Sequence, residues 1–273
     1  MVPPGPLAPD TLEFHAMPNT THRAVAHMMG SLPMGGQVMD TPVFAFHHTP
    51  DGLGFNAQTA LNPQRLDVSL DGLLAFEISD VLTAGECDAV VAATEQLGYR
   101  DEAPGIQTPP GMRMNKSVHW IAPALMMEEI YRRIAPLLPQ AIDARGLAPR
   151  LSQRLNMYRY DAGDVFNRHI DGDWPGYGLN GAADDAAAHM VEWPGSRSML
   201  TTILYLNDAE GGVVGGQTRL FSHSGTTVDI TPSKGSALFF RHGFGRHSVV
   251  HEGSRVTGTA AKYVARINVM YAP

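Results

Sequence analysis

Short apolar-rich runs dominate the C-terminal half of the chain. After Pro149 these runs are separated by Gly, Asp and Pro turns, and eight of them fit into about 120 residues. This spacing is typical of an all-β barrel or a double-sheet jelly roll. The candidate strands are RLNMYRY, VFNRHID, SMLTTILYLN, GQTRLF, TTVDITP, SALFFRH, HSVVHEG and KYVARINVMY.

The segment of about residues 70–148 has a different texture and predicts helices. LLAFEISDVL is typical of a strand, and TAGECDAVVAATEQLG places Thr83 and Glu86 at capping-box spacing, with Gly98 as the helix stop. A second helix is predicted over APALMMEEIYRRIAPLLPQAI, where Pro123 falls in the first turn. The expected fold class is therefore mainly β, with a jelly-roll core of about residues 150–271 braced by N-terminal helices.

Residues 1–40 are rich in Pro, Gly and Met and show no sustained period. Such a segment buries too little apolar surface to offset the entropy lost on ordering. We therefore expect a flexible N-terminal tail, followed by a single domain over residues 41–273.

Composition and charge narrow the possible partners. Hydrophobic residues make up 44% and charged residues 17% of the chain, which suits a globular protein with a core. The net charge of −7 and the scattered Lys and Arg residues argue against a nucleic-acid or an anionic-membrane partner. Cys87 is the single cysteine, and no run approaches about 18 apolar residues, so a cytoplasmic location is expected. The sequence does not specify the oligomeric state.

Two candidate metal ligands occur in FNRHIDGDW, residues 166–174. His169 and Asp171 are two residues apart, and in a strand that spacing directs both side chains to one face. Two histidines and one carboxylate form the facial triad that holds non-haem iron(II) with open positions, so a later histidine is required. The candidates are His189, His223, His242, His247 and His251.

His251 is the preferred third ligand. It follows His169 by 82 residues (251 − 169 = 82), which allows it to come from a strand near the other end of the barrel. His247 lies four residues earlier in the same predicted strand, would face the same side, and is the second choice.

Five motifs resemble one enzyme family when they are taken in order: YRYDAGDVFNRHIDG, ILYLND, GGQTRLF, GSALFF and HEGSRVTGTAAKYVARINVMY. Together they resemble the Fe(II)- and 2-oxoglutarate-dependent dioxygenases, specifically the prolyl 4-hydroxylase-like branch. The resemblance extends over about residues 70–271. It implies a double-stranded β-helix, Fe(II) held by His169, Asp171 and His251, and 2-oxoglutarate and O₂ as co-substrates, with ascorbate as a supporting reductant in vitro.

The resemblance also assigns residues to 2-oxoglutarate. By motif position, Lys262 meets the far carboxylate, because a buried dicarboxylate needs a cation that donates hydrogen bonds. Tyr205 matches a tyrosine that contacts the same carboxylate, and Tyr160 matches one that lines the pocket. The turn before Lys262 is one residue longer than expected, so Arg266, which shares its strand face, is the alternative cation.

Candidate substrate contacts lie on two further segments. The related branch carries an Arg-x-Asn element at the place of Arg113 and Asn115. The long connection over residues 172–197 is expected to act as a lid or as a surface elaboration, with Trp174 and Tyr177 as its candidate contacts.

The predicted reaction is hydroxylation of an unactivated C–H bond, with succinate and CO₂ as co-products. Halogenating relatives lack the metal carboxylate, whereas Asp171 is present here. The substrate is expected to be a free or N-modified amino acid, or a peptidyl residue such as proline. The alternative is a non-catalytic metal-binding jelly roll, or a cupin-like enzyme that does not use 2-oxoglutarate.

Overall fold

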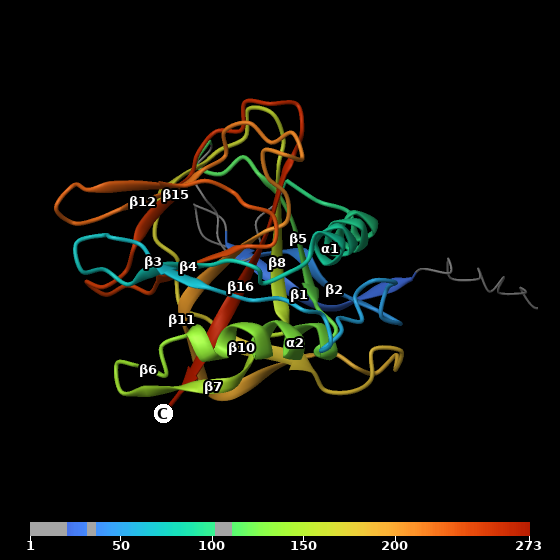
Figure 1. The fold of residues 1–273 in the computed structure, drawn as a ribbon. Helices are drawn as coiled ribbons and strands as arrows, with labels where there is room; N and C mark the ends of the chain where they lie inside the picture. The colour runs from blue at the N-terminus through green and yellow to red at the C-terminus, as the bar shows by residue number, and fades with distance from the viewer. Residues whose placement is uncertain (1–20, 32–36, 102–110) are drawn as a thin grey trace, which may run out of the picture.

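Two β-sheets face each other in the computed structural model, which describes residues 21–31, 37–101 and 111–273 (Figure 1). All pairings are antiparallel except the parallel pair of β2 and β5. The larger sheet runs in the order β1 (His22–Ser31), β2 (Gln37–Phe46), β5 (Lys116–Ile121), β8 (Arg154–Tyr160), β16 (Lys262–Ala272), β11 (Met190–Tyr205), β14 (Ala237–Arg241), β4 (Ala75–Ile78) and β3 (Arg65–Asp67). The smaller sheet runs in the order β13 (Thr227–Ile230), β12 (Thr218–Phe221), β15 (Val250–Gly253) and β9 (Phe166–His169).

Strand alternation gives the larger sheet an inner and an outer face. On β11 and β16, Ile203 pairs with Arg266 and faces the smaller sheet, whereas Leu204 pairs with Ala265 and faces the helices. The predicted mainly β fold is confirmed, and the two facing sheets form the jelly roll of a double-stranded β-helix.

Helix α1 (Ala84–Leu97) has the predicted bounds within one residue. The Thr83 hydroxyl accepts from the Glu86 N–H and the Glu86 carboxylate accepts from the Thr83 N–H, so the capping box is confirmed. Gly98 ends the helix with φ +82°, a conformation that glycine adopts readily.

Helix α2 (Ala124–Ile134) is shorter than predicted. Pro136 lacks the N–H that would continue the helical ladder, so the chain passes into the 3₁₀ turn η1 (Ala135–Leu137). The strand β6 (Ala141–Ile142) then pairs with β7 (Arg145–Leu151).

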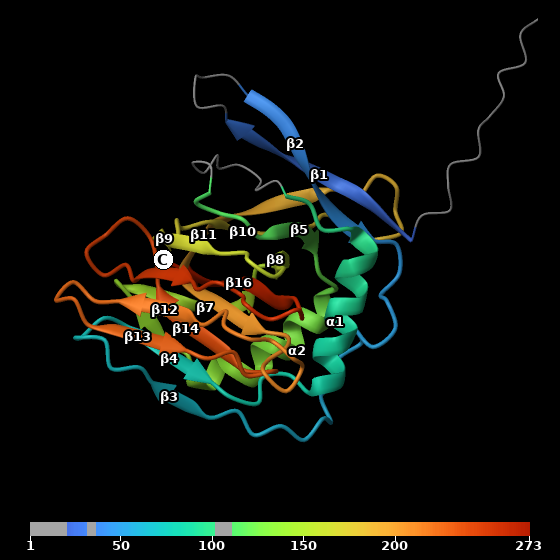
Figure 2. The ribbon, with the colours of Figure 1, turned by 90° about the horizontal axis from the view of Figure 1, so that it is seen from above.

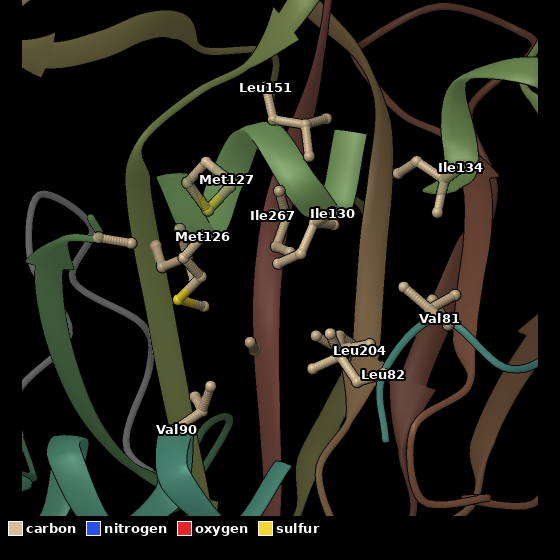
Figure 3. Packing of buried hydrophobic residues seen from close by; sticks show 14 of the residues in the cluster. Val81, Leu82, Val90, Met126, Met127, Ile130, Ile134, Leu151, Leu204 and Ile267 are labelled. Carbon is tan, nitrogen blue, oxygen red and sulfur yellow. The ribbon is translucent and has the colours of Figure 1, made fainter. Parts of the chain in front are cut away.

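The helices cover the outer face of the larger sheet (Figure 2). Ile130 of α2 lies beside Ile267 of β16 in Figure 3, and Met126 of α2 and Leu204 of β11 belong to the same buried cluster. All four side chains are at most 1% exposed, so this layer is a continuous apolar core.

The sequence did not predict the strands β1 and β2 near the N-terminus. β1 and β2 pair with each other within residues 22–46, and Val43 and Phe44 of β2 pair with β5. Both β2 and β5 were missed because their pairings join residues distant in sequence, which local patterns do not record. Residues 1–20 lie outside the described residues.

The connection over residues 172–197 is a hairpin extension and not the irregular loop that was predicted. β10 (Pro175–Leu179) pairs with the first part of β11. The Trp193 ring packs so closely that a Cβ at Gly176 would lie 2.5 Å from it, and a Cβ at Gly178 would lie 2.9 Å from it. The glycines that hid this strand in the sequence are required by its packing.

Helices of the described residues are too short or too polar to span a membrane.

A buried ion cluster ties the two helices together. The Arg133 side chain is 2% exposed, and its Nη1 lies 2.7 Å from Glu86 Oε2 while its Nε lies 2.9 Å from Glu129 Oε1. Glu86 is also the capping residue of α1. One guanidinium therefore joins α2 to the start of α1.

Replacing Arg133 should destabilise the fold strongly, because Arg133→Met leaves the buried Glu86 without a cation and removes the buried one of the two cations at Glu129. We expect a loss of about 3–5 kcal/mol in the free energy of unfolding. The matched control is Arg132→Met, which removes a contact to the same Glu129 from a side chain that is 55% exposed, and it should have little effect. Urea unfolding of both variants measures the difference, and equal losses would contradict the expectation.

Candidate metal and co-substrate site

Three predicted ligands converge between the two sheets. β9 and β15 are neighbours in the smaller sheet, and His169 pairs directly with His251. Asp171 follows β9, and its carboxylate lies 3.8 Å from His169 Nε2 and 3.7 Å from His251 Nε2. One potential ligand atom from each residue lies within 4.8 Å of the other two, and this set is the metal-binding cluster found among the described residues.

Backbone carbonyls orient both imidazoles. His169 Nδ1 lies 2.7 Å from the Asn167 carbonyl oxygen, and His251 Nδ1 lies 3.3 Å from the Val249 carbonyl oxygen. A carbonyl only accepts, so each Nδ1 carries the proton and each Nε2 has a free lone pair directed at Asp171. This is the tautomer in which histidine binds a metal through Nε2.

Burial keeps both imidazoles neutral. Desolvation and the neighbouring His251 lower the pKa of His169 to about 3, and desolvation also lowers the pKa of His251. Desolvation alone would raise the pKa of Asp171, but the Arg266 charge and the Thr201 hydrogen bond oppose it, and that pKa stays well below its usual range. At neutral pH the site therefore offers two neutral nitrogens and one carboxylate, which suits a divalent cation.

A hydrogen-bonded chain holds the carboxylate from behind. The Thr201 hydroxyl donates to Asp171 Oδ2 at 2.7 Å and lies 2.8 Å from His242 Nδ1. His242 Nε2 lies 2.9 Å from the Ser198 hydroxyl, which accepts from the Trp174 N–H. Because Thr201 donates to Asp171, it accepts from His242, and His242 accepts from Ser198.

Thr201 and His242 belong to the site, although the sequence did not single out their role. His242 was considered as a metal ligand, but its two ring nitrogens are engaged with hydroxyls. Desolvation lowers its pKa to about 4, so it is neutral and able to accept at one nitrogen. No motif marks a threonine that is 30 residues from its carboxylate partner.

The predicted 2-oxoglutarate residues lie in the same pocket as the metal cluster. Lys262 of β16 is 2% exposed, and its Nζ donates to the Gly216 carbonyl oxygen at 2.6 Å. The Nζ also lies 5.2 Å from the ring centre of Tyr160 and 5.6 Å from that of Tyr205. The Tyr205 hydroxyl donates to Thr218 at 2.8 Å.

Lys262 is a buried cation without a carboxylate partner in the described part of the chain. Desolvation lowers its pKa to about 7. Arg266, the alternative cation, lies elsewhere in the pocket, with its Nε 3.1 Å from Asp171 Oδ2. The two residues share one strand face, as predicted, but only Lys262 is free of an acidic partner among the described residues.

The candidate substrate contacts divide into two groups. Arg113 donates to Asn115 Oδ1 at 3.0 Å, and its guanidinium lies over the rings of Tyr158 and Phe166, both of which line the pocket. Trp174 and Tyr177 form the second group, and their ring centres lie 5.4 and 5.5 Å from the guanidinium carbon of Arg154.

The second-choice metal ligand lies outside the site. His247 is exposed in the turn before β15, where its Nε2 accepts from Arg246 at 3.2 Å. The predicted strand HSVVHEG begins at Val250, so His247 and His251 do not share a strand face. His189 and His223 are likewise exposed.

A family model supports the resemblance that the five sequence motifs indicated. The model described as the 2OG-Fe(II) oxygenase superfamily matches residues 155–270. Over these residues, the chain is similar to the 2OG-Fe(II) oxygenase superfamily. The match runs from β8 to β16 and includes the three clustered ligands and Lys262. That family implies Fe(II), 2-oxoglutarate and O₂ as cofactor and co-substrates, and the His169, Asp171 and His251 cluster fits this set.

Solved structures resemble the chain more distantly. A viral collagen prolyl hydroxylase from Paramecium Bursaria Chlorella virus-1 is 22% identical, with 76% of this chain and 100% of that chain covered and a TM-score of 0.49. A prolyl-4-hydroxylase from Pseudomonas putida is 17% identical, with 74% and 93% covered and a TM-score of 0.47. A prolyl hydroxylase from Trichoplax adhaerens is 16% identical, with 72% and 83% covered and a TM-score of 0.46. These values do not assign the chain to one branch of the superfamily. No curated protein gives a significant match.

The donor set fits the iron and the oxo acid. Two Nε2 lone pairs and a carboxylate lie within reach of one ion, and Lys262 supplies a buried cation that lacks an anion among the described residues.

Removing the carboxylate should abolish tight metal binding, because Asp171→Ala deletes a charged ligand. We expect Mn(II), used as an inert probe, to bind more than about 100-fold more weakly, since even changes behind the ligands typically cost 10- to 100-fold. Asp173→Ala is the matched control, because Asp173 lies in the same segment but pairs with Arg197 at the surface. Competition against a chelator measures both affinities, with a thermal melt to verify folding. Equal weakening in the two variants would contradict the assignment.

Proposed function

We propose that the protein hydroxylates an unactivated C–H bond of an amino-acid-type substrate and releases succinate and CO₂. The observation that carries this proposal is a single pocket whose wall includes the His169, Asp171 and His251 cluster together with the buried Lys262. The substrate is a free or N-modified amino acid, or a peptidyl residue such as proline.

Each residue has a defined task in this reaction. His169, Asp171 and His251 would hold Fe(II) through two nitrogens and a carboxylate, and this ligand set leaves coordination positions open for the co-substrates. When bound, Fe(II) with 2-oxoglutarate and O₂ supplies the oxidising chemistry that places oxygen on the C–H bond. Lys262 holds the far carboxylate of 2-oxoglutarate through a charge-assisted hydrogen bond.

Apolar side chains shield the space between these groups. Ile203, Val264 and Phe166 line the pocket between the Lys262 end and the metal cluster. They exclude water from the reacting groups, which strengthens the contact between Lys262 and a carboxylate and prevents side reactions. Tyr160 and Tyr205 pack beside Lys262 and fix its position.

The affinity for 2-oxoglutarate should fall as the pH rises through about 7. Burial lowers the pKa of Lys262 to about 7, and the carboxylate binds the protonated amine, so affinity is highest below that value and decreases above it. Lys262→Arg keeps its charge over this range and should show a flat profile. Titration of 2-oxoglutarate into both Mn(II)-loaded proteins between pH 6 and 9 measures the effect. The ratio of their two 2-oxoglutarate affinities at each pH cancels changes in metal affinity that both proteins share. Parallel profiles would contradict the role of Lys262.

The purified protein loaded with Fe(II) should convert 2-oxoglutarate to succinate in air, with ascorbate present. Lys262→Met should bind 2-oxoglutarate about 30-fold more weakly or worse, because a charge-assisted contact to a buried carboxylate is worth roughly 2–5 kcal/mol. Mass spectrometry of candidate substrates should then show a gain of one oxygen. A loaded protein that neither binds nor consumes 2-oxoglutarate would refute the proposal and leave a metal-binding jelly roll.

A further inference from the structure

Five buried Lys and Arg residues lie in the described core, and four of them have an assigned partner. Arg133 pairs with two carboxylates, Arg241 pairs with Asp143, Arg266 pairs with Asp171, and Lys262 is assigned the carboxylate of 2-oxoglutarate. Arg154 is 6% exposed and forms no ion pair within the described residues. A guanidinium buried without a counter-charge is costly, so Arg154 points to an anion that arrives from outside the chain.

Two aromatic rings lie near Arg154, and one of its polar atoms is unpaired among the described residues. Its guanidinium carbon lies 5.4 Å from the ring centre of Trp174 and 5.5 Å from that of Tyr177, and its Nε has no hydrogen-bond partner among the described residues. Desolvation lowers the pKa of Arg154, and the neighbouring Tyr177, with which it hydrogen-bonds, opposes this shift only in part. Arg266 has a carboxylate 3.1 Å from its Nε, whereas Arg154 has no carboxylate partner among the described residues.

His119 supplies a second polar contact beside Arg154. It is 2% exposed, and its Nδ1 lies 2.6 Å from Asn156 Oδ1, which only accepts, so the free Nε2 is itself an acceptor. That Nε2 has no partner in the part of the chain that the structure describes. On the paired strands β5 and β8, His119 lies opposite Asn156, and Arg154 lies two residues further along β8 on the same face, so the two residues are diagonal neighbours.

The strand register puts this site on the far side of the metal from Lys262. On the paired strands β8 and β16, Lys262 lies opposite Tyr160 and Arg266 lies opposite Asn156, four residues or about 13 Å along. Arg154 lies a further two residues, or about 7 Å, in the same direction on the same face. The metal cluster at Arg266 therefore lies between two buried cations, Lys262 and Arg154.

We propose that Arg154 binds a carboxylate of the substrate to be oxidised, while His119 Nε2 accepts from an N–H or O–H group beside it. This inference rests on the proposed function and selects among its substrates. A free or N-acylated amino acid carries the required carboxylate, whereas an internal peptidyl residue does not. Trp174 and Tyr177 then flank the carboxylate-binding guanidinium.

The test compares matched acids and amides. The probes are free and N-acetylated L-amino acids, each paired with its primary amide, titrated into protein that holds Mn(II) and saturating 2-oxoglutarate. We expect at least one acid to bind 10-fold or more tightly than its amide. In Arg154→Met this preference should disappear, while the affinity for 2-oxoglutarate stays within about threefold of the native value.

Two controls make the result decisive. Arg150→Met removes an arginine that also stacks on a tryptophan, Trp193 at 3.8 Å, but is exposed, and it should keep the preference. If Arg154→Met does not bind 2-oxoglutarate because it fails to fold, Arg154→Lys replaces it. Arg154→Lys keeps the positive charge but lacks the planar, two-pronged guanidinium, so its preference for the acid over the amide should be reduced but not lost.

The outcomes separate this inference from the proposed function. Failure of the native protein to bind 2-oxoglutarate refutes the proposed function. Normal binding of 2-oxoglutarate, with no acid preferred to its amide across the panel or with the preference intact in Arg154→Met, refutes the carboxylate site alone. Tight binding of a capped peptide with no free carboxylate would likewise overturn it.

Discussion

The ion pair between Arg266 and Asp171 keeps the carboxylate of the metal cluster ionised, and the other groups of the pocket depend on it. Arg266 belongs to β16 of the larger sheet, and Asp171 follows β9 of the smaller sheet, so the pair joins the two sheets across their interior. Without the guanidinium, burial would favour the protonated form of Asp171 and remove the charged ligand of the metal cluster. With it, the carboxylate is ionised and faces two neutral imidazoles. A metal site in an apolar core therefore depends on a cation that does not itself bind metal.

The buried cations of this protein show how a structural charge differs from a functional one. Arg133 is surrounded by two carboxylates that come from the same chain, and its role ends with the joining of two helices. Lys262 and Arg154 have comparable burial, yet the described residues supply no acid to either. Folding places these two groups in a low-dielectric interior at a free-energy cost that only an external anion offsets. We interpret the absence of an internal partner, rather than burial itself, as the mark of a binding residue.

Local patterns in the sequence predicted much of the fold and the metal cluster. β8 has the predicted bounds, α1 has the predicted cap, and the i, i+2 spacing brought His169 and Asp171 together. The missed parts depend on contacts between distant residues. β10 was hidden because its glycines make room for Trp193, and Thr201 was hidden because its partner lies on another strand. Arg154 sits in a stretch that was correctly predicted as a strand, but only the three-dimensional contacts show that it lacks an acid.

The same hydrogen-bonded chain connects the metal side of the pocket with the proposed substrate side. Asp171 accepts from Thr201, Thr201 from His242, His242 from Ser198, and Ser198 from the Trp174 N–H. Trp174 in turn packs on Arg154. Thr201 and Ser198 both belong to β11, so one strand fixes the orientation of the metal carboxylate and the backbone of the ring that flanks the free guanidinium. The two sides are therefore held at a constant separation by a rigid element, which is what an oxygenase requires to keep one C–H bond within reach of its iron.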